Sequence, residues 1–168
     1  MKELPPRHES IRGYFAYELY KQMQTNPDIV VISADLGYGM FDHIKNNFPD
    51  RFFNVGASEV SAVGIAVGMA QEGKIPFVYS ITPFLLFRAA EVIRNYVNHE
   101  QIPVKLIGSG FQNDYQHDGF SHHNYDDRQL MEIFNNIKAE WPQTKEEIED
   151  IVNWSINNGK PTYINLRR

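Results

Sequence analysis

Apolar residues along the chain recur at two alternating spacings, one helical and one typical of strands. The first stretch with helical spacing covers 11–23, with Ser10 before it as a potential N-cap. Short β-branched runs such as 29–33 predict buried strands instead. Further helices are predicted at 41–48, 58–72, 84–98, 126–134 and between a capping box at 144–147 and Gly159, and further strands at 52–55, 76–81, 103–107, 136–140 and 161–166.

This alternation of strand and helix predicts the fold class. We expect an α/β fold in three layers, a doubly wound and mainly parallel sheet with helices on both faces. We expect one domain over residues 1–168, with 1–9 as an N-terminal extension. Ligands of such sheets bind beyond the carboxyl ends of the strands. Candidate chemistry is therefore expected at Asp35, at 56–59, at 81–84 and from Gly108 onward.

Composition and charge narrow the classes of function. The net charge is −5 and the 16 basic residues form no run, which argues against a nucleic-acid or anionic membrane surface. The chain has no cysteine, so disulfides and thiolate catalysis are excluded. No stretch has the length of a signal peptide or of a membrane span. We expect a cytoplasmic protein.

The most informative stretch is 53–64, where an apolar strand ends at Gly56 and a helix of small residues begins with Glu59 in its first turn. Acids are common in first turns because the helix dipole stabilises them, and this interpretation needs no function. The flanking residues, however, are apolar or small, so the carboxyl group is expected to be buried. A buried acid is costly unless it has a partner or is protonated. Gly64 and Gly68 each cost about 0.5–1 kcal/mol relative to alanine inside a helix, which indicates a closely approaching backbone or ligand.

Three other features admit both a structural and a functional interpretation. Phe84 and Phe87 at a strand-to-helix junction suit either a core or a wall that stacks on a planar ligand. The segment 108–110 is only part of a dinucleotide-binding fingerprint, since the third glycine is missing. The polar loop 108–125 and the residues after it suit a solvated loop, a substrate-binding loop or a metal site, although no zinc motif is matched. The loop and its flank contain Asp114, His117, Asp118, His122, His123, Asp126 and Asp127.

Six motifs occur in an order that matches one known family. They are Ala-Asp-Leu at 34–36 and the segments 51–59, 82–95, 103–108, 118–122 and 161–167. With these motifs the chain resembles the pyrimidine-binding domain of transketolase and its relatives, which include deoxyxylulose-phosphate synthase and split transketolases. The resemblance covers residues 10–168.

The resemblance implies thiamine diphosphate as cofactor. The acid matching Glu59 hydrogen-bonds N1′ of the aminopyrimidine and promotes the imino tautomer, which takes the proton from C2 of the thiazolium. Phe84 matches an aromatic residue that packs on the pyrimidine ring. Asp35 matches an acid near the cofactor, and His122 matches a histidine that contacts substrate hydroxyls. Phe87 would widen the aromatic wall.

The chain also departs from the family pattern. Residues 37–40 replace a segment in which relatives usually have serine or threonine, which weakens the case for phosphate recognition there. Ser121 stands where the family favours threonine, and 131–134 lacks an arginine that relatives often carry. These departures argue against a standard sugar phosphate as the preferred substrate.

The sequence also lacks the Gly-Asp-Gly motif with which the family holds Mg²⁺ and the diphosphate. The resemblance therefore implies that a partner subunit supplies the diphosphate-binding domain and Mg²⁺ in a hetero-oligomer, with a heterotetramer expected. Exposed apolar surface on helix 58–72 would form the contact. The expected reaction transfers a ketol or acyl unit from a ketose or a 2-oxo acid to an aldehyde. Two alternatives stay open: a non-catalytic regulatory subunit with the same fold, and a stand-alone flavodoxin-like ligand-binding module.

Overall fold

Six parallel strands form one sheet in the order β2-β1-β3-β4-β6-β5. The structure is a computed structural model that describes residues 3–168. The strands are β1 (Ile29–Ser33), β2 (Phe52–Asn54), β3 (Ile75–Ile81), β4 (Lys105–Ser109), β5 (Lys138–Glu140) and β6 (Thr162–Leu166).

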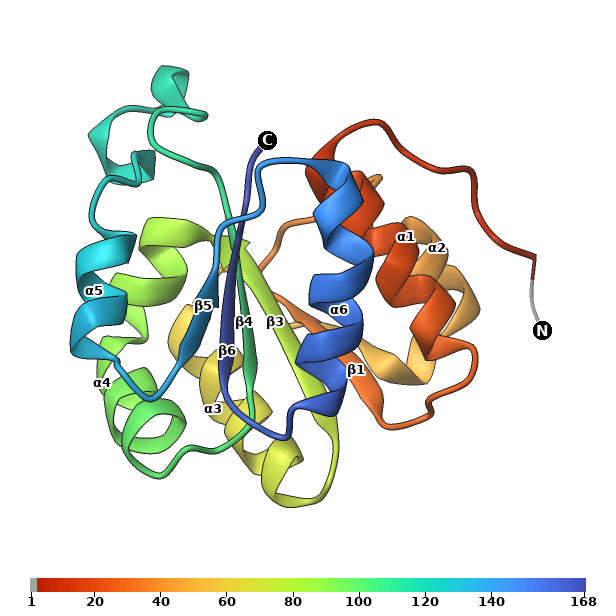
Figure 1. Cartoon of the computed structure of the whole chain (residues 1–168), viewed down its shortest axis with the longest axis horizontal. Helices are drawn as coiled ribbons and strands as arrows, with labels where there is room; N and C mark the ends of the chain where they lie inside the picture. The colour runs from red at the N-terminus through yellow and green to blue at the C-terminus, as the bar shows by residue number, and fades with distance from the viewer. Residues whose placement is uncertain (1–2) are drawn as a thin grey trace.

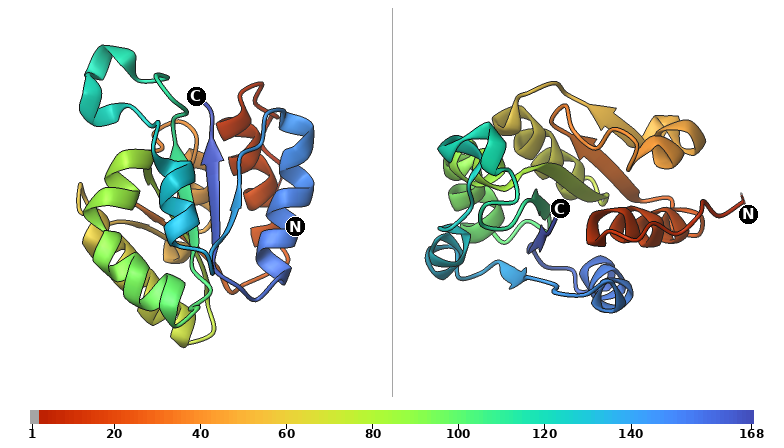
Figure 2. Two further views of the ribbon diagram at one scale, coloured as in Figure 1. Left: turned by 60° about the vertical axis from the view of Figure 1, so that its left-hand side comes forward. Right: turned by 90° about the horizontal axis from the view of Figure 1, so that it is seen from above.

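Helices cover both faces of this sheet and make three layers (Figures 1 and 2). One face carries α1 (Ile11–Met23), α2 (Asp42–Asn47) and α6 (Ile148–Asn157). The other carries α3 (Glu59–Gln71), α4 (Ala90–Val92) and α5 (Asp127–Ile133). Each face has its own cluster of buried apolar side chains. The predicted α/β architecture is confirmed.

Side-chain alternation along β3 connects the sheet with the predicted site. Phe77 and Tyr79 pack in the core beneath α1 and α2, whereas Val78 packs in the core beneath α3. Because successive side chains of a strand point to opposite faces, Ser80 faces α3 as Val78 does. The strand thereby directs a buried hydroxyl group at the first turn of α3.

The strand order contains a topological switch point at β1. From β1 the chain first adds β2 on one side and then β3 on the other. Ligands of doubly wound sheets bind in the crevice at such a point, outside the carboxyl ends of the strands. The loop after β4 and the C-terminus both lie at this edge, at the top of Figure 1.

Two predicted elements were wrong in detail. The single α-helix expected at 84–98 is interrupted, since π-helical turns at Phe84–Arg88 and Ile93–His99 flank the short α4. Apolar spacing cannot distinguish a π turn from an α turn over so few residues, and π turns are frequent at functional sites. β4 begins at Lys105 and includes Gly108 and Ser109, which the sequence pattern places in the loop. The N–H group of Val104 bonds the carbonyl of Ile102 instead of a neighbouring strand, which accounts for the late start.

The predicted caps are confirmed. Ser10 accepts a hydrogen bond from the backbone of Gly13 at the start of α1. Thr144 and Glu147 form a capping box, which leads through a 3₁₀ turn at Lys145–Glu147 into α6.

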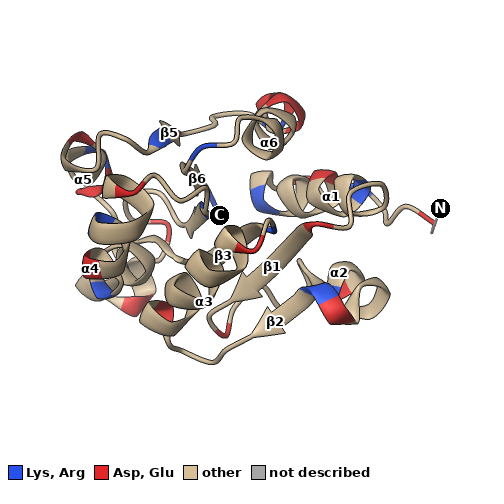
Figure 3. Cartoon of the chain, turned by 90° about the horizontal axis from the view of Figure 1, so that it is seen from below, with Lys and Arg blue, Asp and Glu red and all other residues tan. Residues whose placement is uncertain are grey.

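Acidic and basic residues are interspersed over the helices in Figure 3. Among residues 3–168, no helix is long and apolar enough to cross a membrane.

Candidate functional site

Glu59 lies in the first turn of α3 with its side chain only 3% exposed. The hydroxyl group of Ser80 donates a hydrogen bond of 2.9 Å to its Oε1 atom. Nη1 of Arg88 donates a hydrogen bond of 2.9 Å to its Oε2 atom and completes an ion pair. A buried carboxylate is tolerated only when donors and an opposite charge replace water around it. The predicted burial of Glu59 is therefore accompanied by two strong partners.

Arg88 belongs to the first π turn and lies between Glu59 and Phe84. Its guanidinium carbon is 3.8 Å from the centroid of the Phe84 ring, within the range of a cation–π contact. The side chain of Arg88 is 47% exposed, so this contact forms at the edge of the site. Sequence reasoning assigned no role to Arg88. The sequence held one indication of such a residue, because a buried acid at Glu59 requires a charged or hydrogen-bonding partner.

Phe84 also meets His122, so two of the predicted site residues lie together. Their ring centroids are 4.7 Å apart in an edge-to-face arrangement. His122 ends a 3₁₀ turn (Phe120–His122) in the loop after β4, and its Nδ1 atom is 3.1 Å from the hydroxyl group of Ser121. Glu59, Arg88, Phe84 and His122 therefore form one continuous row of contacts at the carboxyl edge of the sheet.

A buried hydrogen-bond network holds the strand ends beneath this row. The Asn165 amide donates to Thr82 at 2.8 Å and to the carbonyl of Gly110 at 2.9 Å. The hydroxyl group of Tyr163 donates to Asp127 at 2.9 Å. Burial, followed by the adjacent Asp127 carboxylate, raises the pKa of Tyr163 well above its usual value. The network ties β3, β4 and β6 to the start of the loop that carries His122.

The base of that loop has little room for change. A Cβ atom on Gly108 would lie 2.5 Å from the Thr82 hydroxyl oxygen, so a larger residue would disturb the network. Gln112 and Asn124 close the loop through an isolated antiparallel bridge, and the Asn124 amide also donates to the Gly110 carbonyl. The loop is therefore anchored at both ends, although most residues between the anchors are exposed.

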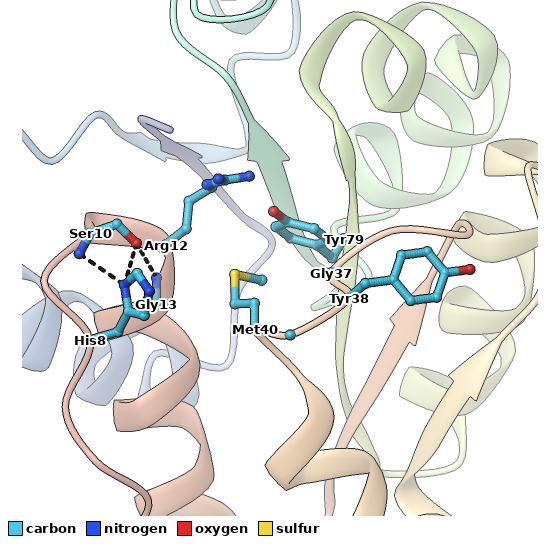
Figure 4. Close-up of a pocket in the computed structure, with 9 residues that line it drawn as sticks. His8, Ser10, Arg12, Gly13, Gly37, Tyr38, Met40 and Tyr79 are labelled. Atoms are coloured by element: carbon cyan, nitrogen blue, oxygen red, sulfur yellow. Dashed lines mark hydrogen bonds between the residues drawn. The ribbon is translucent and has the colours of Figure 1, made fainter.

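A cavity of about 340 Å³ opens between the start of α1 and the loop at 37–40 (Figure 4). Nη1 of Arg12 donates to Tyr115 at 3.1 Å and to Ser109 at 3.3 Å, while its Nε atom is buried without a hydrogen-bond partner. A guanidinium in a cavity lining suits an anionic ligand through its positive charge. The cavity is lined by His8, Arg12, Gly13, Tyr38, Met40 and Tyr79, among others.

Arg12 was not identified from the sequence because its partner Ser109 is 97 residues away. Tyr115 connects the cavity with the row described above, since its ring centroid is 6.3 Å from that of His122. The candidate site therefore extends from Glu59 to Arg12 along one edge of the sheet.

Asp35 lies on the loop after β1, and Phe87 lies on the first π turn directly before Arg88. Asp35 adopts a φ of 56° after β1 and accepts hydrogen bonds from Tyr38 and Asn54. These bonds, the one from Tyr38 first, lower the pKa of Asp35 below its usual value. Phe87 is 52% exposed. Their contacts with a cofactor stay predictions. Within residues 3–168, no group of three or more His, Asp or Glu side chains is arranged to hold a metal ion.

Comparison with known proteins agrees with the resemblance drawn from the motifs. Residues 9–168 match the family described as transketolase, pyrimidine binding domain. One of the subunits of apulose-4-phosphate transketolase from Actinobacillus succinogenes is 38% identical over 159 residues, which are 94% of this chain and 51% of that protein. A putative transketolase C-terminal section from Methanocaldococcus jannaschii is 28% identical, with 100% of this chain and 54% of that protein covered.

Solved structures of transketolases also resemble this chain. A split-gene transketolase, described as an inactive β4 tetramer, superposes with a TM-score of 0.83 at 32% identity, covering 95% of this chain and 51% of that one. Transketolase from Leishmania mexicana has a TM-score of 0.85 at 18% identity and covers 98% of this chain and 26% of that one, so it supports the fold alone. The chain thus spans about half the length of the split relatives it matches.

Proposed function

Because this chain belongs to the transketolase pyrimidine-binding domain family, we propose that it supplies the pyrimidine-binding half of the active site in a two-component, thiamine-diphosphate-dependent transketolase-like enzyme. The observation that carries the proposal is the buried Glu59 carboxyl group, which Arg88 links to the Phe84 ring at the carboxyl edge of the sheet. The enzyme would be active only when a second subunit completes the site.

The described residues fit one half of thiamine diphosphate. An aminopyrimidine needs a carboxyl group for N1′ and a flat surface for its ring, and Glu59 and Phe84 offer these two features. The sequence has no Gly-Asp-Gly motif for the diphosphate. We therefore assign the diphosphate and Mg²⁺ to the partner subunit. When bound, the cofactor supplies a nucleophilic carbon and an electron sink.

The residues of this chain would bind, orient and exchange protons. Glu59 would hold N1′ and share a proton with it, at a position where its side chain is only 3% exposed. Phe84 fixes the plane of the ring. His122, in edge contact with Phe84, contacts hydroxyl groups of the substrate. Asp35 and Phe87 would border the cofactor from the β1 loop and the first π turn.

The Arg12 cavity supports an anionic donor. Arg12 brings a positive charge to the cavity lining, which suits a phosphate or carboxylate group and favours a phosphorylated ketose or a 2-oxo acid as donor and an aldehyde as acceptor. One relative is named for apulose 4-phosphate. The loop at 37–40, where family hydroxyl groups are missing, would then serve as a wall of the cavity while Arg12 provides the charge. The product would be a new ketose or acyl adduct in cytoplasmic carbohydrate metabolism.

The outer face of α3 suits the contact with the diphosphate-binding subunit. Val60 and Ile65 are 49% and 40% exposed. A Cβ atom on Gly64 or Gly68 would meet nothing within 4 Å, so a second backbone has room to approach. A heterotetramer would place the sites at subunit interfaces, whereas the split-gene relative is described as an inactive β4 tetramer.

Reconstitution tests the proposal. The chain is mixed with a subunit that carries Gly-Asp-Gly and a downstream asparagine, together with thiamine diphosphate and Mg²⁺, and exchange of the C2 proton is followed by NMR. We expect exchange and ketol transfer only when both subunits are present, with each subunit alone as the control. A complex that binds the cofactor without accelerating exchange would instead support the non-catalytic regulatory subunit. A monomer that never associates would favour the stand-alone ligand-binding module.

A further inference from the structure

The Arg88 side chain occupies the place that an aminopyrimidine would need. One of its nitrogens bonds Oε2 of Glu59 at 2.9 Å, and its guanidinium lies 3.8 Å from the centroid of Phe84. These are the acid and the aromatic ring that the proposed function assigns to the cofactor. Arg88 therefore satisfies both surfaces of the site in the free chain.

The chemistry of the guanidinium group explains why it fits. It is planar, carries N–H donors along its edge and stacks on aromatic faces. An aminopyrimidine with a proton on N1′ presents the same features, a flat ring with an N–H donor at its edge. We propose that Arg88 is a placeholder for the aminopyrimidine, which leaves the site when the cofactor binds. This inference rests on the proposed function.

Glu59 and Arg88 differ in the freedom of their side chains to move. The Glu59 side chain is 3% exposed and is also held by Ser80, whereas the Arg88 side chain is 47% exposed. Arg88 can return to water by a change of rotamer, while Glu59 stays where it is. The guanidinium lies on a surface turn of π-helical geometry, so its departure requires no change in the sheet or in α3.

The placeholder has a consequence for cofactor affinity. Only the fraction of molecules with Arg88 displaced accepts the pyrimidine, so the apparent dissociation constant is the intrinsic constant divided by that fraction. In return, the buried carboxylate of Glu59 keeps a charged partner in most molecules before the cofactor arrives. The site then exchanges one planar cationic donor for another rather than opening to water.

The dissociation constant of thiamine diphosphate with Mg²⁺ tests this inference in the complex of both subunits, by calorimetry and without turnover. For Arg88→Ala we expect binding about tenfold tighter, as for a placeholder present in about nine molecules of ten. A purely structural role for Arg88, or a direct bond from it to the cofactor, would weaken binding instead. Weaker or unchanged binding overturns the inference.

Two variants control for side effects. Arg88→Gln keeps a neutral donor beside Glu59, so it protects the fold if Arg88→Ala is unstable, and we expect its binding to be about threefold tighter. Arg94→Ala removes an arginine of the same segment whose guanidinium bonds Asn95, and its binding should equal that of the wild type.

A direct observation separates this inference from the proposed function. In the wild-type complex, the ¹⁵N resonance of the Arg88 Nε–H group should move toward the position of a solvated arginine when the cofactor is added. A resonance that stays unchanged while the cofactor binds overturns the placeholder and leaves the proposed function intact. A complex that binds no thiamine diphosphate overturns both.

Discussion

Replacing Glu59 by glutamine separates the role of this carboxyl group in catalysis from its role in the fold. The variant keeps the size of the side chain and an oxygen that accepts the Ser80 bond, and it removes the charge that Arg88 contacts. A hydrogen bond to a charged group contributes about 1.5–3 kcal/mol to stability. Desolvation of a buried carboxylate, which the amide avoids, costs several kcal/mol.

These two effects oppose each other, and Arg88 is exposed enough to be hydrated when it is released. We therefore expect the free energy of unfolding of Glu59→Gln to lie within about 1 kcal/mol of the wild-type value. The proton shared with N1′ acts only in the reaction, and loss of such a group lowers rates about 10²–10⁴-fold. Stability and activity should thus respond very differently to the same change.

Denaturant unfolding of the chain and steady-state kinetics of the reconstituted enzyme give the two numbers. The expected result is a nearly unchanged unfolding midpoint together with kcat lowered at least about 100-fold and C2 proton exchange slowed in parallel. Activity within threefold of the wild type, in a complex that assembles normally, would refute the assignment of Glu59.

Three further changes test other parts of the molecule. Phe84→Ala should weaken thiamine diphosphate binding about three- to tenfold through lost stacking, measured by calorimetry; unchanged affinity would contradict the ring contact. Arg12→Ala should raise KM about 10–100-fold for a phosphorylated donor but little for its unphosphorylated analogue, and equal effects on both donors would contradict an anion site. Burial lowers the pKa of Lys105 from 10.5 to about 8. The unfolded chain therefore binds more protons between these values, so the free energy of unfolding should rise by roughly 3 kcal/mol between about pH 8 and 10.5. Lys105→Met should lack this rise in denaturant unfolding at each pH, and equal slopes for the two proteins would contradict the prediction.

The fold was largely predictable because its signals are local. Helical and strand spacings, the Ser10 cap and the capping box at 144–147 each depend on residues within a few positions of one another. The π turns that flank α4 were not predicted, since a widened turn preserves nearly the same apolar spacing over so short a stretch. The strand order was also not predicted, because the alternation of strands and helices indicates parallel strands but not which strands are neighbours.

Some residues of the candidate site were also predictable from the sequence and others were not. Glu59, Phe84 and His122 stood out in the sequence, because an acid among apolar residues and motifs in a fixed order are properties of the chain itself. Arg88 reaches Glu59 across 29 residues and Arg12 reaches Ser109 across 97, and neither contact leaves a mark in local spacing.

The sequence by itself determined the alternation of elements, the family and the buried acid, since short-range periodicity and chemical identity require no knowledge of distant neighbours. Only the tertiary structure decided what surrounds that acid. Parallel strands bring the ends of distant segments to one edge of the sheet, and there the charge on a half-exposed arginine meets a carboxylate that water cannot reach.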